Sequence, residues 1–129
     1  MPVAQLSHAG QLVLGFDGED PVAVMTLQDE DELHWPDARR DSALYLHKLA
    51  VRRAHAGQGW SARMLEWACA RARQRRRPFL RLDCSPIPKL TQLYEAQGFA
   101  RVDERPVLAG RHLSVRFERA AFRRRGRIV

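Results

Sequence analysis

The 129-residue sequence contains only two cysteines, Cys69 and Cys84, and no long apolar run. Two thiols are too few for a disulfide framework or a four-thiolate zinc site, and we expect a reducing cytoplasm as the compartment. The apolar runs are too short for a transmembrane helix, and the first ten residues lack the basic flank and apolar core of a signal peptide. We therefore expect neither a leader nor a membrane partner.

The sequence also lacks the two commonest phosphate-binding loops. It has no GxxxxGK[ST] pattern, which disfavours a nucleoside triphosphatase. It has no GxGxxG followed by an acidic residue about 20 positions later, which disfavours a dinucleotide fold. No histidine, cysteine or carboxylate has metal-ligand spacing along the chain, so we expect no metal.

Lysine is scarce, since only Lys48 and Lys89 occur among 22 basic residues. Residues 1–70 hold 6 basic and 10 acidic side chains, whereas residues 71–129 hold 16 and 5. Arginine clusters at 71–77 and 123–127 leave open a nucleic-acid-binding module, whose affinity would fall steeply with salt. No recognition motif accompanies the arginines, so we expect nucleic acid not to be the partner.

The remaining patterns indicate one α+β domain over residues 1–129, because domains usually run about 100–200 residues. Strand-like runs bounded by turn residues lie at 11–16, 22–27, 43–51, 79–84, 99–105 and 113–119. Helical spacing of apolar residues predicts helices over 60–75 and 89–97. This order implies a mixed, mostly antiparallel sheet with one parallel pair and flanking helices. We expect residues 120–129 to form a frayed basic tail.

A glycine-rich turn, Ala56-Gly57-Gln58-Gly59-Trp60-Ser61, connects the strand 43–51 to the first helix. A helix start leaves backbone N–H groups unpaired and carries partial positive charge. Small residues allow a phosphate to approach that backbone, and Arg53 adds charge just before the turn. The turn suits a diphosphate, although a tight connection that binds nothing would also need glycine.

Leu49-Ala50-Val51 followed by this turn resembles the acetyl-CoA motif of the GNAT N-acyltransferases. Leu93-Tyr94-Glu95-Ala96-Gln97-Gly98-Phe99 resembles the second signature of that family, a helical tyrosine followed by glycine and phenylalanine. The resemblance covers about 11–118 and implies a GNAT-like sheet in which the parallel strands splay apart. Members usually begin with a strand and two helices, so we expect residues 1–10 to be a reduced remnant of that element.

The resemblance implies an N-acetyltransferase that moves an acetyl group from acetyl-CoA to a primary amine by direct attack. The backbone of Leu49, Ala50 and Val51 would hold the pantetheine arm and the oxyanion of the tetrahedral intermediate. The residues implied at the diphosphate are Arg53, Ala56, Gly57, Gln58, Gly59, Trp60 and Ser61. The acceptor implied is a small-molecule or peptide amine, and an exposed C-terminal strand leaves a homodimer open.

One departure from the family pattern keeps an alternative open. Ala56 stands where members usually have arginine or glutamine, so one phosphate contact is missing unless Arg53 replaces it. A degenerate member that binds CoA without turnover is therefore an alternative to the enzyme.

Two side chains are candidates for proton transfer. Tyr94 is the candidate general acid, because a thiolate leaving group needs a proton that a phenol can provide; the alternative is a core tyrosine. His47, which strict alternation places on the face of Leu49, is the candidate general base for the amine. A water chain to Asp41 or Glu32 is the alternative to His47.

Trp35 lies in the acidic stretch between the second and third predicted strands. It is a candidate acceptor-pocket residue, and a tryptophan that packs back onto the sheet is the alternative.

Overall fold

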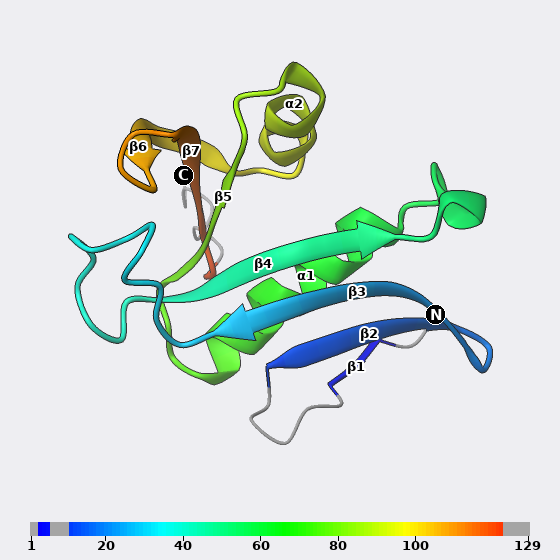
Figure 1. The fold of residues 1–129 in the computed structure, drawn as a ribbon. Coiled ribbons are helices and arrows are strands. Elements are labelled where there is room, and N and C mark those ends of the chain that lie inside the picture. The colour runs from blue at the N-terminus through cyan, green and yellow to red at the C-terminus, as the bar shows by residue number, and fades with distance from the viewer. Residues whose placement is uncertain (1–2, 6–10, 123–129) are drawn as a thin grey trace, which may run out of the picture.

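One seven-stranded sheet runs through the described part of the chain, which comprises residues 3–5 and 11–122 of the computed structural model (Figure 1). Its strands lie in the order β1-β2-β3-β4-β5-β7-β6. The elements are β1 (Val3–Gln5), β2 (Leu12–Asp17), β3 (Asp20–Gln28), β4 (Ala43–Val51), a 3-10 turn η1 (Arg53–His55), α1 (Trp60–Gln74), β5 (Phe79–Cys84), α2 (Pro88–Ala96), β6 (Ala100–Val107) and β7 (His112–Ala120). The predicted fold class, a mixed sheet with flanking helices, is confirmed.

The parallel pair predicted at the centre of the sheet consists of β4 and β5. They pair only from Ala43 and Phe79 to Leu46 and Leu82, after which both strands continue without pairing to each other. Every other neighbouring pair of strands is antiparallel in the described residues. The predicted splay of the central strands is therefore present.

A β-bulge interrupts β4 just beyond the paired segment. Thr26 of β3 pairs with His47 and Val24 pairs with Ala50, so two steps on β3 match three on β4. Lys48 takes a φ of 56°, a left-handed conformation that is uncommon outside glycine. Bulges bend a strand and re-aim its side chains. The strict alternation predicted across the whole of 43–51 is therefore wrong beyond His47.

Helix α1 covers one face of the sheet over β3, β4 and β5 (Figure 1). Its apolar residues recur at spacings of three and four, which places them on one buried stripe. The buried residues of α1 are Trp60, Met64, Leu65, Ala68, Cys69 and Ala72. A Cβ at Gly15 of β2 would lie 3.0 Å from the Trp60 ring, so a larger residue there would push the ring away and loosen this close approach of helix and strand.

The ends of the chain can be described only in part. Val3–Gln5 form β1, which pairs with β2, whereas residues 1–2 and 6–10 lie outside the described residues. At the other end, β7 includes Ala120, and Ala121 is buried and donates its N–H to Pro78 O over 2.8 Å. Of the predicted frayed tail, Ala120 thus lies in β7 and Ala121 is buried beside it, and residues 123–129 lie outside the described residues. No helix in 3–5 and 11–122 is long and apolar enough to cross a membrane.

Candidate functional site

The glycine turn between β4 and α1 faces open space. Gly57 and Gly59 have φ values of 76° and 83°, which strain any other residue. A Cβ built on either glycine would meet no atom within 4 Å. Gly59 caps α1 without a side-chain hydrogen bond, and the first turn of α1 holds no acidic residue. The amide end of α1 is therefore open to an anion.

The other residues predicted to hold a diphosphate surround this turn. Arg53, Ala56 and Gln58 are exposed, and Ser61 is half-buried. Trp60 is different, because the residue is 1% exposed and packs in the core. Its side chain is therefore not available to a ligand.

Leu49, Ala50 and Val51 lie on the part of β4 that has separated from β5. Ala50 and Val51 still pair with β3, on the other side of β4. The edge of β4 that faces β5 has no ladder partner beyond Leu46 in the described chain. Free backbone N–H and C=O groups at such an edge can hydrogen bond to an extended ligand.

A cavity of about 490 Å³ opens where β4 and β5 separate. We call it the divergence cavity; its lining includes Leu46, His47, Lys48, Leu82, Asp83 and Tyr94. The structure thus brings the two predicted proton-transfer residues, His47 and Tyr94, to one cavity next to the unpaired stretch of β4.

Tyr94 lies at the wall of the divergence cavity and is 8% exposed. Its ring packs edge-on against Phe99 and tilted against Phe117, each with centroids 5.9 Å away. Burial, helped by the charges of Cys84 and Asp83, raises the pKa of Tyr94 to about 12. The phenol therefore stays protonated near neutral pH, as a proton donor must.

His47 is joined in the divergence cavity by three residues to which sequence reasoning assigned no role. His47 Nε2 lies 3.3 Å from Asp31 Oδ2. His34 Nδ1 lies 3.1 Å from Asp31, and His34 Nε2 lies 3.3 Å from Asp83 Oδ2. The Asp31-x-x-His34 spacing was visible in the sequence, but nothing in it connected that pair to His47 or Asp83.

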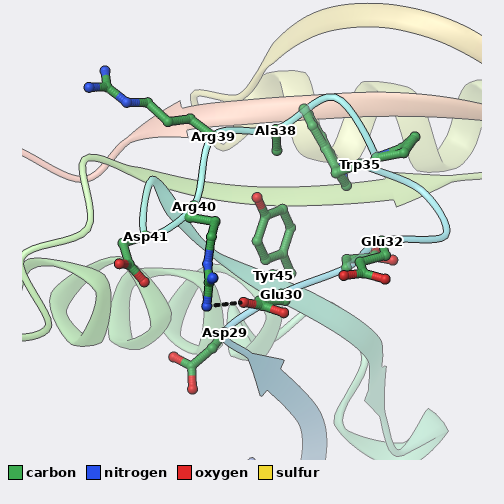
Figure 2. Close-up of a pocket in the computed structure, with 11 residues that line it drawn as sticks. Asp29, Glu30, Glu32, Trp35, Ala38, Arg39, Arg40, Asp41 and Tyr45 are labelled. Atoms are coloured by element: carbon green, nitrogen blue, oxygen red, sulfur yellow. Dashed lines mark ion pairs between the residues drawn. The ribbon is translucent and has the colours of Figure 1, made fainter.

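The carboxylates considered as alternatives to His47 lie elsewhere. Asp41 and Glu32 line a separate cavity of about 540 Å³, which we call the loop cavity (Figure 2). Asp41 pairs with Arg77 over 3.1 Å. In Figure 2, Arg40 reaches Glu30 across this cavity, with 3.7 Å between the charged atoms. Asp31, which also lines the loop cavity, is the acidic residue that contacts His47.

Trp35 packs back onto the sheet. It is 6% exposed and lies beside Tyr45 with ring centroids 6.1 Å apart. The guanidinium of Arg116 lies 4.4 Å from the centre of the Trp35 ring, and that of Arg81 lies 5.0 Å away. Trp35 lines the loop cavity, so an acceptor role would be limited to its small exposed edge.

The arginines of 71–77 are largely engaged with the protein itself. Arg75 and Arg77 reach Asp29 over 2.9 and 3.4 Å, and Arg73 donates to the carbonyl of Ala121 over 2.7 Å. Within this segment, Arg75 and Arg77 are therefore the arginines that pair with carboxylates, and Arg76 is exposed.

Three comparisons place these features among known proteins. The model of the acetyltransferase (GNAT) family matches residues 3–99. The uncharacterized N-acetyltransferase YesJ of Bacillus subtilis strain 168 is 36% identical over 87 residues, which are 64% of this chain and 48% of that protein. The chain therefore spans about half the length of this curated relative.

Solved structures share the fold. A GNAT-family acetyltransferase from Listeria monocytogenes 4b F2365 matches with a TM-score of 0.72 at 24% identity, over 86% of this chain and 64% of the other. A GNAT-family acetyltransferase from Elizabethkingia anophelis with acetyl-CoA bound matches with a TM-score of 0.71 at 14% identity, over 84% and 74%. At these identities the likeness shows the fold alone.

Proposed function

Because the chain belongs to the acetyltransferase (GNAT) family, we propose that it transfers an acetyl group from acetyl-CoA to a primary amine. One observation carries the proposal: β4 leaves β5 after Leu46, and the glycine turn that follows η1 faces open space. An extended thioester needs a free strand edge and an anion site beyond the end of that edge. The segment from β4 to the start of α1 offers both.

The donor would be held mainly by backbone groups. The amides of Gly57 to Ser61 at the start of α1 would bind the diphosphate, with Arg53 adding charge in place of a side chain at Ala56. Backbone groups of Leu49, Ala50 and Val51 would hold the pantetheine arm. The N–H groups of the same three residues would stabilise the oxyanion.

The transfer would be a direct attack in the divergence cavity. The neutral amine nitrogen attacks the thioester carbonyl carbon, the C–S bond breaks, and the sulfur leaves as thiolate. His47, directly or through water, would first accept a proton from the acceptor ammonium. Tyr94 would donate the proton that the thiolate takes up, and the nitrogen of the new amide would release its second proton to the Tyr94 phenolate, directly or through water. Asp31 would orient the His47 ring.

The acceptor, the extent of the catalytic domain and the cellular compartment are also part of the proposal. The acceptor would be a small-molecule or peptide amine, and residues 1–129 would act as one catalytic domain. The thiols of Cys69 and Cys84 are unpaired, which agrees with a reducing cytoplasm.

Acetyl-CoA binding and turnover test the proposal separately. Acetyl-CoA should raise the melting temperature of the protein, and a panel of primary amines should release free CoA thiol. A thermal shift with no turnover on any amine would favour a CoA-binding member without activity. The absence of a shift at millimolar acetyl-CoA would contradict the proposal.

A further inference from the structure

Asp31, His47 and Asp83 bring three potential metal-ligand atoms together in the divergence cavity. One ligand atom from each lies within 4.8 Å of the other two. Asp31 lies in the β3–β4 loop, His47 in β4 and Asp83 in β5. Because the three residues are far apart in the sequence, their spacing gives no sign of the cluster, and the sequence alone predicts no metal. We propose that these side chains form a binding site for a divalent transition-metal ion of the Zn²⁺ type.

Both carboxylates of the cluster are held in place by outer contacts. Asp31 Oδ1 accepts the backbone N–H of His34 over 3.1 Å. Asp83 Oδ2 accepts a hydrogen bond from Ser114 Oγ over 2.9 Å. Such outer partners orient metal ligands and account for a large part of a site's affinity.

His47 supplies an observation independent of the carboxylates. Its Nε2 atom is buried and has no hydrogen-bond partner among the described residues, although Asp31 Oδ2 lies 3.3 Å away. The Asp31 side chain is itself only 6% exposed. His34 already contacts the Asp31 carboxylate, whereas Nε2 of His47, in a side chain that is 19% exposed, has no partner in the described chain. A buried ring nitrogen without a partner is costly unless a cation or a hydrogen-bonding group satisfies it. Coordination through Nε2 would do so.

The donor set selects the class of ion. Imidazole nitrogen with carboxylate oxygen suits Zn²⁺ and its neighbours rather than Mg²⁺ or Ca²⁺, which prefer oxygen ligands alone. Ligands about 2.0–2.1 Å from a tetrahedral zinc lie about 3.4 Å apart. The His47–Asp31 separation of 3.3 Å already has this value, and the Asp83 ligand atom, which lies within 4.8 Å of both, would move toward them on binding. The cavity leaves the fourth position to water.

A bound ion would affect the proposed chemistry. It would replace the contact between His47 Nε2 and Asp31 that orients the ring, and its positive charge would oppose proton uptake by the imidazole, so the metal would inhibit acetyl transfer. The inhibition rests on the proposed function, whereas the binding site does not.

Cobalt(II) added to the full-length, chelator-treated protein tests the site without acetyl-CoA. One equivalent should give the intense visible absorption of four-coordinate cobalt(II), and Zn²⁺ should displace it. His47→Gln and Asp83→Asn should each weaken cobalt binding at least tenfold, because loss of an outer partner alone costs about 10–100-fold. Glu32→Gln and His112→Gln, which change exposed residues of the same types, should bind like the wild type.

Two results would overturn the proposal: no four-coordinate spectrum, or a spectrum that survives both ligand substitutions. Circular dichroism and melting curves of the variants establish that lost binding is not lost folding, and the isosteric Asp83→Asn is the variant least prone to misfold. Because the readout needs no acetyl-CoA, failure of the metal site leaves the acetyltransferase proposal standing. If acetyl-CoA fails to raise the melting temperature, the metal-site proposal likewise still stands.

Discussion

Leu46 of β4 and Leu82 of β5 are the last residues at which the two parallel strands pair. Immediately beyond them, Lys48 adopts its left-handed conformation and forms the bulge against β3. The end of the ladder and the bulge together free one edge of β4 next to the divergence cavity. The proposed acetyl transfer depends on this relationship.

Removing the phenol of Tyr94 should slow the chemical step without affecting the donor. Tyr94→Phe keeps the ring packed on Phe99 and Phe117 but cannot give a proton to the leaving thiolate. We expect kcat to fall about 100-fold, with the Kd of acetyl-CoA near that of the wild type. Steady-state kinetics and calorimetry measure the two quantities.

The other tyrosine provides the matched control for Tyr94. Tyr45→Phe removes a hydroxyl that accepts a hydrogen bond from Arg81 over 3.2 Å, away from the divergence cavity, and should leave kcat within about twofold. Unchanged turnover in Tyr94→Phe would remove Tyr94 from the mechanism.

Asp31 and His47 should act together on the acceptor. His47→Gln removes the proposed base and Asp31→Asn removes its orienting carboxylate, so each should lower kcat/KM for the amine in chelator-treated buffer. Because they act as one unit, the double variant should be little worse than His47→Gln alone. Fully additive losses would show that Asp31 acts independently of His47.

The ion pairs of Arg116 should make stability depend on acid pH. Arg116 is 3% exposed and donates to Asp37 over 2.6 Å and to Asp103 over 2.6 and 2.7 Å. The hydrogen bond from Arg116 lowers the pKa of Asp37 from 3.8 to about 2. A carboxyl with a depressed pKa stabilises the folded state when the pH is above the ordinary pKa of 3.8. This contribution is lost as the pH falls through the folded-state pKa of about 2.

Urea unfolding of Asp37→Asn measures that contribution. The variant should be less stable than the wild type at pH 7, and the difference between their midpoints should shrink as the pH falls toward 2. Glu32→Gln, an exposed change in the same loop, should show no such convergence. A difference that stays constant from neutral to acid pH would contradict the assignment.

The sequence was sufficient to predict the order of the strands from β2 onward and of both α-helices, with most of their bounds, because apolar periodicity and the turn residues act locally, whereas β1 and η1 were not predicted. Pro78 and Pro88 mark the start of β5 and of α2, and Gly98 follows α2 as expected. Arg116 shows the limit of local rules. A charged residue in the middle of β7 is expected at the surface, yet it is buried because Asp37, 79 positions away, pairs with it.

The same limit applies to the site. The glycine turn and Tyr94 are visible in the sequence, since a short motif carries each. The bulge at Lys48 follows from the register between β3 and β4, and the contacts of His47 with Asp31 and of His34 with Asp83 follow from tertiary packing. Neither the register between strands nor the packing between distant segments can be predicted from a single amino-acid sequence.

The central claim is that the open amides of the glycine turn bind the diphosphate of acetyl-CoA. Gly57→Glu places a carboxylate there, at a φ of 76°, whereas Gly110→Glu introduces the same charge and similar backbone strain, at a φ of 81°, in the β6–β7 turn. Both positions have open space around a Cβ, so the two variants differ chiefly in location.

Calorimetric titration of acetyl-CoA into the wild type and these two variants is the most direct measurement. We predict saturable binding by the wild type and Gly110→Glu, and a loss of at least about 100-fold in Gly57→Glu, equal to about 2.7 kcal/mol. Equal affinity in all three proteins, or no binding by the wild type, would contradict the account.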